Sequence, residues 1–367
     1  MRLSRSVISE REMAAVRAVL ERGYLGMGSE VARFEQDLSA YLEGTPVACV
    51  NTGTAAVHLA LQGIGIGAGD EVLIPTLTYV ASFQAVTACG GKPVACEVRE
   101  ADGLIDLKDA ARRVTPRTKA VMPVHYASYP GDLDAIYSFA RDHKLRVVED
   151  AAHAFGCRYR GKKIGTFADV ACFSFDGIKN ITSGEGGAVV TRDARVLERV
   201  RDARLLGVEK DTDKRYRGER SWEFDVSAQG WRYHMSEIMA AIGRVQLTRL
   251  DSEFAPARAA LAARYRERLR DCRHVRMFEH PAEGVVPHIF PVRITGSKRD
   301  SVMQALHAQA IQTGLHYKPN HLLTRFGGGK PGFPVAERIW DEMLSLPLHP
   351  ALQKSDVDRV CDIVSAA

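Results

Sequence analysis

The sequence predicts an α/β protein in which a large domain, built on a mostly parallel sheet of seven strands, is followed by a smaller α+β domain. Short apolar segments of the kind found in buried strands alternate with amphipathic segments along most of the chain. Apolar runs without polar alternation indicate strands covered on both faces, as in parallel sheets. A strongly helical segment, residues 236–270, then precedes a mixed C-terminal region. The 367 residues suffice for two domains, and we expect residues 1–245 in the large one and residues 246–367 in the small one.

The individual elements follow in order from the same pattern. Apolar residues recur at helical spacing between residues 10 and 21, and Ser9 precedes them as a suitable N-cap. A second helix is expected at 30–42 and a third at 55–61, with a strand at 47–50 between them. The other six strands are expected at 71–75, 92–96, 120–124, 145–149, 169–175 and 188–191. The helices between them are expected at 80–88, 107–112, 132–143 and 194–206, and the C-terminal region should hold a strand at 285–294 and helices at 301–309 and 355–364.

Composition excludes several classes of protein. Hydrophobic residues make up 46% of the chain and charged residues 26%, which is ordinary for a globular protein. The net charge of +5 is spread over 50 basic and 45 acidic residues, which argues against a nucleic-acid partner. The seven cysteines form no CxxC pair, so we expect free thiols in a reducing, cytoplasmic setting and no metal site. No apolar run approaches the ~18 residues that a membrane-spanning helix needs.

A phosphate-binding turn is expected after the first strand. Asn51, Thr52, Gly53 and Thr54 join that strand directly to a helix, and a helix start offers unpaired backbone amides to an anion. A second glycine-rich stretch, residues 63–68, matches the GxGxxG/A dinucleotide pattern. It follows a helix and precedes a strand, which is the reverse of the order that a dinucleotide site requires. An NAD-dependent oxidoreductase is therefore the weakest reading.

Asp150 ends an apolar strand, next to Glu149. Side chains at the carboxyl ends of parallel strands face the crevice where α/β proteins bind ligands. A carboxylate there can hold a protonated pyridine nitrogen, although Asp150 could equally be the N-cap of a helix. His153, three residues further on, could be a ligand-facing or a structural histidine.

Lys179 lies between two apolar segments, with the glycine turn Gly184, Gly186 and Gly187 after it. Loss of solvation lowers the pKa of a lysine, and a neutral amine is the form that attacks a carbonyl to form a Schiff base. A surface lysine is the plain alternative. Together, the phosphate turn, the aromatic Tyr79 after another strand, Asp150 and Lys179 supply the four parts of a pyridoxal phosphate site: phosphate cup, ring contact, pyridinium partner and Schiff-base lysine.

From residue 23 to residue 350 the chain resembles the DegT- or StrS-type sugar aminotransferases, which depend on pyridoxal phosphate. The motifs that carry the resemblance are Asn51-Thr52-Gly53-Thr54-Ala55-Ala56, Glu149-Asp150-Ala151-Ala152-His153-Ala154-Phe155-Gly156, and Ser174-Phe175 through Lys179-Asn180 to Gly187. The resemblance implies fold-type I and a homodimer with shared active sites. It also implies that Lys179 and Asp150 are catalytic, that Ser174 binds the cofactor phosphate, and that Gly53, Thr54, Ala55, Tyr79 and His153 complete the cofactor site.

Further residues follow from the resemblance alone. Residues 230–237 resemble the segment that a partner subunit inserts into the site, and Arg232 stands where many members have asparagine. An arginine can also bind a phosphate, so the resemblance implies that Arg232 binds the cofactor across the subunit interface, with a plain surface arginine as the alternative. Tyr24, Tyr317 and His321 are the expected substrate contacts, and no metal is expected. The implied reaction moves an amino group from L-glutamate to a keto sugar nucleotide, with amination at C4 favoured over C3, for a surface polysaccharide such as lipopolysaccharide or for a glycosylated metabolite.

Alternatives to this reaction stay open. Related dehydratases have histidine in place of the lysine, and Lys179 argues against them. A keto-cyclitol aminotransferase and a non-catalytic regulatory protein with the same fold remain possible readings of the sequence.

Overall fold

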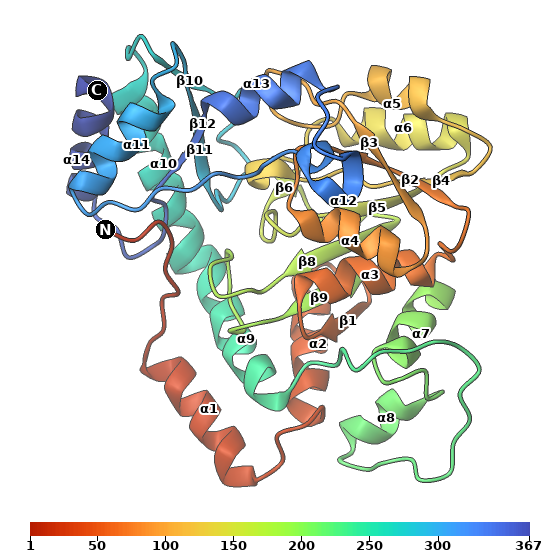
Figure 1. Ribbon diagram of the computed structural model, residues 1–367. Helices are drawn as coiled ribbons and strands as arrows, with labels where there is room; N and C mark the ends of the chain where they lie inside the picture. The colour runs from red at the N-terminus through yellow and green to blue at the C-terminus, as the bar shows by residue number, and fades with distance from the viewer.

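A seven-stranded sheet forms the centre of the protein in a computed structural model that describes all residues, 1–367 (Figure 1). Its strands lie in the order β1-β9-β8-β5-β4-β2-β3. They are β1 (Val47–Val50), β2 (Glu71–Pro75), β3 (Lys92–Cys96), β4 (Thr118–Val121), β5 (Arg146–Asp150), β8 (Val170–Ser174) and β9 (Gly187–Val190). Only β9 runs against its neighbours, β1 and β8, and the other pairs are parallel. The predicted sheet is confirmed.

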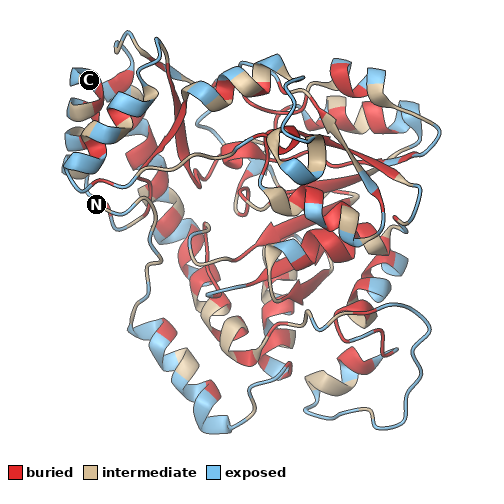
Figure 2. Ribbon diagram, in the orientation of Figure 1, coloured by how far each residue is buried: buried red, intermediate tan, exposed pale blue.

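Helices cover both faces of this sheet, which explains why its strands are apolar throughout (Figure 2). On β1, Ala48 and Val50 pack into one core cluster, and Val47 and Cys49 pack into the other. The first cluster includes side chains of α3 (Gly53–Gly63), α4 (Val80–Ala88) and α7 (Ala194–Ala203). The second includes side chains of α2 (Ser29–Tyr41), α5 (Leu107–Arg113), α6 (Leu133–His143) and α9 (Glu237–Arg249).

The C-terminal region has a core of its own around an antiparallel three-stranded sheet. Its strands are β10 (Val275–Met277), β11 (Phe290–Ile294) and β12 (Met343–Leu346). Helices α10 (Ala255–Leu269), α11 (Arg299–Ala308) and α14 (Lys354–Ala366) contribute to this core, and α13 (Pro334–Glu342) lies beside β11. The π-helical turn Leu250–Phe254 joins α9 to α10. The predicted domain boundary, between residues 245 and 246, falls inside α9, and the division into two domains stays a prediction.

Most of the sequence-based elements are present, and the differences have local causes. Helix α3 begins two residues before the predicted start because Thr52 caps it, with its hydroxyl accepting from the Ala55 amide at 3.0 Å. Helix α8 (Asp211–Tyr216) lies in a charged stretch whose apolar spacing predicted no helix. Residues 158–163 form the small hairpin of β6 (Arg158–Tyr159) and β7 (Lys162–Lys163). The remaining short elements are the 3-10 turns Tyr126–Ser128 and Asn320–Leu322, and helix α12 (Thr324–Gly327).

Three whole-chain findings bear on the composition-based expectations. All seven cysteines are free, and five of them are buried. None of the helices combines the length and apolar character that crossing a bilayer would need. No cluster of histidine, cysteine and acidic side chains has the arrangement of a metal site.

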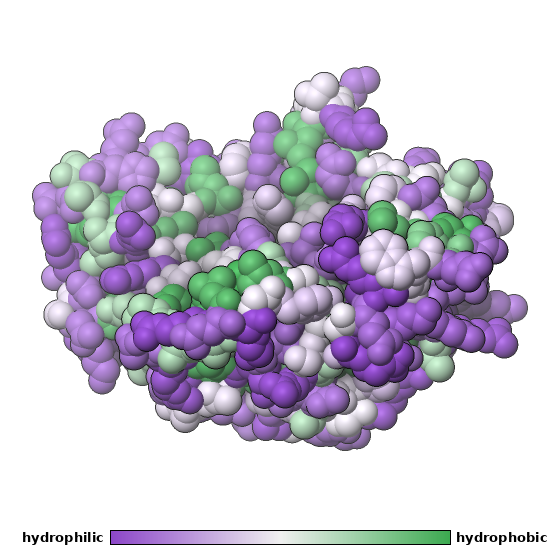
Figure 3. Space-filling view, turned by 90° about the horizontal axis from the view of Figure 1, so that it is seen from below, coloured by the Kyte–Doolittle hydropathy of each residue, from purple (hydrophilic) through white to green (hydrophobic).

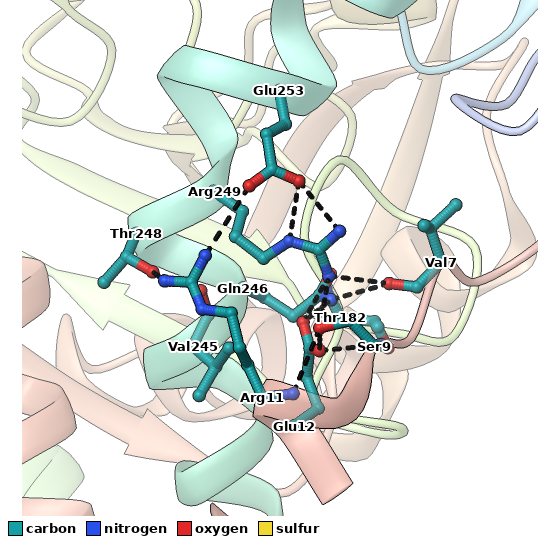
Figure 4. Close-up of polar contacts among 10 residues, drawn as sticks. All are labelled: Val7, Ser9, Arg11, Glu12, Thr182, Val245, Gln246, Thr248, Arg249 and Glu253. Carbon is teal, nitrogen blue, oxygen red and sulfur yellow. Dashed lines mark hydrogen bonds and ion pairs between the residues drawn. The ribbon is translucent and has the colours of Figure 1, made fainter.

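The N-terminal segment ties the C-terminal region to α9. The Leu348 amide donates to the Leu3 carbonyl at 3.0 Å, so the first residues of the chain lie next to the segment that follows β12. Helix α1 (Glu10–Arg22) then packs on α9, where Arg249 contacts Glu12 at 2.7 Å (Figure 4). Burial alone would raise the pKa of Glu12, but hydrogen bonds from Ser9, Arg249 and Gln246 outweigh burial and lower the pKa to about 2.

We therefore expect Arg249→Met to lower the free energy of unfolding by about 3 kcal/mol at pH 7, because it leaves the Glu12 carboxylate buried without its cation. Urea titration followed by circular dichroism measures this loss. Arg17→Met, on the exposed face of α1, the helix that carries Glu12, is the control. The double variant Glu12→Gln/Arg249→Met should recover part of the loss, and equal losses in the single and double variants would contradict the pairing.

Candidate active site

A cavity of about 490 Å³ opens at the carboxyl ends of the parallel strands. It takes its lining from the starts of α3 and α4, from the ends of β5 and β8, from the loop after β8, and from the distant loop at residues 316–317. The lining residues are Thr52, Gly53, Thr54, Val57, Thr78, Tyr79, Ala81, Val124, Asp150, Ala152, His153, Ser174, Asp176, Ile178, Lys179, Glu185, His316 and Tyr317. The structure thus brings together seven of the residues predicted from the sequence as cofactor or catalytic residues.

Lys179 supplies the amine of this cavity. It lies on the loop between β8 and β9, and its Nζ atom is 3.4 Å from Nε2 of His288. Burial lowers the pKa of Lys179 to about 8, and the carboxylates of Asp176 and Asp150 only partly oppose this shift. A substantial share of this amine is therefore neutral near pH 8, as the sequence predicted for a nucleophilic lysine.

Asp150 is the last residue of β5, and its carboxylate faces the cavity. Its Oδ2 atom accepts a hydrogen bond from the Ser82 hydroxyl at 2.7 Å, and its Oδ1 atom accepts from the Ala152 amide at 3.3 Å. Ser82 is itself 3.0 Å from the Thr78 hydroxyl, so two residues near the start of α4 fix the carboxylate. No helix begins after Asp150, so the alternative reading of this residue as an N-cap is wrong.

Three aromatic side chains line one side of the cavity. Nε2 of His153 lies 3.0 Å from the Tyr317 hydroxyl, and the rings of Tyr317 and Tyr79 are 5.5 Å apart between centroids. Burial and the positive charge of Lys179 hold the pKa of His153 well below its usual value, so its ring is neutral. Tyr79 is 56% exposed and leaves a ring face available at the mouth of the cavity.

The start of α3 lies where the sequence predicts an anion site. The first amides of a helix have no acceptor within the helix, and of these the Ala55 amide is taken by Thr52. A Cβ atom at Gly53 would lie 2.7 Å from Cβ of Ser174, so only glycine lets the helix start approach this serine. Gly53, Thr54 and Ser174 therefore make a cradle for a phosphate group, which fits pyridoxal phosphate. Ala55, predicted with them, lies behind the cradle and does not line the cavity.

Three predicted residues lie elsewhere. His321 does not line the cavity because its ring nitrogens are engaged by the Thr76 hydroxyl at 2.7 Å and by Glu337 at 3.0 Å. Tyr24 lies outside the lining, and its hydroxyl donates to the Met27 carbonyl at 3.2 Å. Arg232 is exposed and lies outside the cavity of its own chain.

Sequence reasoning missed several residues of the site. Asp176 and Glu185 flank Lys179 on the same loop, and Ser82 lies near the start of α4. The acidic residues had a signal, because they belong to the lysine segment itself. His288 had none, since 109 residues separate it from Lys179 in the sequence and no local pattern marks it.

The charges of the cavity are unbalanced. Its lining holds the carboxylates of Asp150, Asp176 and Glu185, whereas Lys179 is the only lysine or arginine among the lining residues. Burial lowers the pKa of His316 to about 4, so this histidine adds no positive charge at neutral pH. An anionic ligand in this cavity would therefore have to be bound by backbone amides and hydroxyls of this chain, or by cations from outside the chain.

Comparisons with known proteins agree with this geometry. The model of the DegT/DnrJ/EryC1/StrS aminotransferase family matches residues 6–365. The aminotransferase TlmJ from Streptoalloteichus hindustanus is 35% identical, with a TM-score of 0.91, and the match covers 99% of this chain and 97% of TlmJ. DesV from S. venezuelae, solved with a ketimine intermediate, is 38% identical, with a TM-score of 0.89 over 97% of this chain and 94% of DesV.

A third similar structure identifies the cofactor. The sugar aminotransferase Spr1654 from Streptococcus pneumoniae, in its PLP-form, is 27% identical, with a TM-score of 0.92 over 100% of this chain and 98% of Spr1654. Spr1654 has also been solved in a PMP-form. The family, the fold-type I architecture and the pyridoxal phosphate cofactor predicted from the sequence are confirmed. The chain belongs to the DegT/DnrJ/EryC1/StrS aminotransferase family, and it is a pyridoxal phosphate-dependent transaminase whose solved relatives include sugar aminotransferases.

Proposed function

We propose that the protein transfers an amino group from L-glutamate to a keto sugar nucleotide, and that C4 of the sugar is the position aminated. The observation that supports this best is the Lys179 amine, with a pKa lowered to about 8, in one cavity with the fixed carboxylate of Asp150. The cavity of about 490 Å³ has room beyond the cofactor site for part of a sugar. The expected product is an amino sugar for a surface polysaccharide, such as lipopolysaccharide, or for a glycosylated metabolite.

The residues of this chain divide the work in the proposed reaction. When bound, pyridoxal phosphate supplies an electron sink for the carbon that loses a proton. Gly53, Thr54 and Ser174 hold the phosphate through amides and a hydroxyl, and Asp150 keeps a proton on the pyridine nitrogen. Lys179 would hold the cofactor through its Nζ atom, and the same amine in its free form would act as the base and acid for the proton transfer. The Ser82 hydroxyl, which donates to Oδ2 of Asp150 at 2.7 Å, would keep this carboxylate fixed for its contact with the ring nitrogen.

A homodimer would supply the cation that this cavity lacks. We propose that Arg232 of a second copy reaches the cavity, because Arg232 is exposed and does not line the cavity of its own chain. The neighbouring loop exposes large apolar side chains, with Trp222 86%, Phe224 57% and Val226 47% exposed, which a second copy would cover. The face viewed in Figure 3, on the side of α1 and α8, is largely hydrophilic, with hydrophobic patches (green) among the hydrophilic residues (purple).

The substrate contacts and the location of the enzyme are part of the same proposal. Tyr317 lines the cavity next to His153 and is the substrate contact that its position favours. Tyr24 would reach a sugar nucleotide only if the ligand extends beyond the cavity lining. The free, mostly buried cysteines agree with the cytoplasmic location expected from the sequence.

Lys179→Ala should abolish covalent attachment of the cofactor and lower kcat by at least about 10³-fold, because the variant has no amine to hold the cofactor or to move the proton. Borohydride reduction followed by peptide mapping shows which lysine carries the cofactor. Lys119→Ala, at an exposed position of β4, is the matched control. Label on any other lysine, or turnover that survives the substitution, contradicts the assignment of Lys179.

Asp150→Asn should retain the cofactor but lower kcat of the glutamate half-reaction by about 10²–10³-fold, because a neutral amide cannot stabilise a proton on the pyridine nitrogen. Stopped-flow absorbance measures the half-reaction, and Asp142→Asn on the exposed surface of α6 is the control. A variant with normal rates would show that Asp150 does not contact the ring nitrogen.

The substrate is tested by a panel of keto compounds with glutamate as donor, followed by the release of 2-oxoglutarate. We expect 4-keto nucleotide sugars to give the highest kcat/KM. A higher kcat/KM for 3-keto sugars would contradict amination at C4 and favour C3. A higher kcat/KM for keto-cyclitols would contradict a sugar nucleotide as the substrate. A protein that fails the glutamate half-reaction itself would contradict the proposed donor, and failure with every amino donor would leave only the non-catalytic reading.

A further inference from the structure

His288 approaches Lys179 from the C-terminal region of the chain. It lies two residues before β11, and its Nε2 atom is 3.4 Å from the Lys179 Nζ atom. No other hydrogen bond to a side chain or carbonyl engages the lysine amine. His288 lies in none of the segments that the sequence marked as functional, although its ring is the polar group nearest to the reacting amine.

The backbone around this contact is held by buried polar groups. The Arg258 guanidinium donates to the His288 carbonyl at 3.1 Å and to the Lys179 carbonyl at 3.3 Å. Arg258 also donates to the carbonyls of Pro287 and Leu348, and no carboxylate pairs with it. The Ser128 hydroxyl accepts the His288 amide at 2.9 Å. Arg258 therefore fixes the histidine and the lysine relative to each other through their main chains.

The His288 ring is neutral in this setting. Burial comes first among the causes that hold the pKa of His288 well below its usual value, and the neighbouring Lys179, His153, Arg258 and His316 act in the same direction. The ring of His153 lies 4.5 Å away between centroids. Nδ1 of His288 is buried without a partner, so Nε2 is the only ring nitrogen in use. A neutral imidazole with its hydrogen on Nδ1 presents an acceptor to the amine.

We propose that His288 is a positioning residue for the transamination proposed above, and that its Nε2 atom accepts a hydrogen bond from Nζ of Lys179 whenever this amine is free. The contact keeps the released lysine at the edge of the cavity, where the amine can return a proton to the reacting carbon. It also stabilises the ammonium form, because a hydrogen-bond acceptor favours the charged state of a donor. Burial pushes the amine towards the neutral form, and His288 limits that effect.

Glutamine and asparagine at position 288 separate this role from a structural one. The side-chain oxygen of glutamine reaches about as far as Nε2 of histidine, whereas that of asparagine reaches only as far as Nδ1. Both variants are polar and smaller than histidine, so neither overfills the site. His288→Gln should keep the contact with Lys179, and His288→Asn should lose it.

The test is the pH dependence of Lys179 acylation in the cofactor-free protein, read by competitive labelling and mass spectrometry. This measurement needs neither sugar nor amino donor, so its outcome is independent of the proposed function. We expect the apparent pKa of Lys179 to fall by about one unit in His288→Asn and to stay near the wild-type value in His288→Gln. His280→Asn, at a half-buried histidine bonded to the Asp102 carbonyl outside the cavity, should leave the titration unchanged.

The holoenzyme gives the second readout. In the glutamate half-reaction, kcat should fall about tenfold in His288→Asn with little change in KM, and His288→Gln should recover most of the rate. Equal Lys179 titrations in all variants, or equal shifts in the glutamine and asparagine variants, would overturn the proposal. A wild-type Lys179 titration in His288→Asn accompanied by a lower melting temperature would assign His288 a purely structural role.

Discussion

The absence of a side chain at Gly187 is the constraint on which the site depends. Gly187 pairs with Val50 of β1 on one side and with Ser174 of β8 on the other. A Cβ atom there would lie 2.4 Å from the Thr52 carbonyl oxygen, a contact that backbone atoms cannot relieve without moving. The reversed strand β9 therefore draws the turn after β1 and the end of β8 together. The start of α3, with the predicted phosphate site, follows β1 directly, and the loop that carries Lys179 follows β8 directly. Both therefore begin next to Gly187.

The sequence predicted the large sheet and the centre of the site because their signals are local. Asp150 ends the apolar strand β5 and Lys179 lies on the loop that follows the apolar strand β8, and the topology of parallel strands brings the carboxyl ends of these two strands to one edge. Ala55 was placed in the cofactor site because it continues the motif, but the capping hydroxyl of Thr52 takes its amide. Helix α8 was missed because its charged residues gave no apolar period.

Residues that come from the C-terminal region could not be predicted in the same way. His321 carries the same type of side chain as a ligand-binding histidine, and only its contacts with Thr76 and Glu337 reveal a structural role. His288 is the opposite case, since only the folded chain brings its ring to Lys179. A sequence shows which residues could take part in catalysis or binding. It does not show which hydrogen-bond partners they have, because these partners come from segments far apart in the chain.

The wall of the cavity is shared between two parts of the chain, each with a core of its own and with one further hydrophobic cluster between them. Asp150 and Lys179 belong to the large sheet and its loops, whereas His316 and Tyr317 come from the C-terminal region, as does His288, which contacts Lys179. A small rotation of one part against the other would change the space open to a sugar and the proton affinity of the lysine in the same movement. Such a movement would couple the size of the cavity to the basicity of the amine.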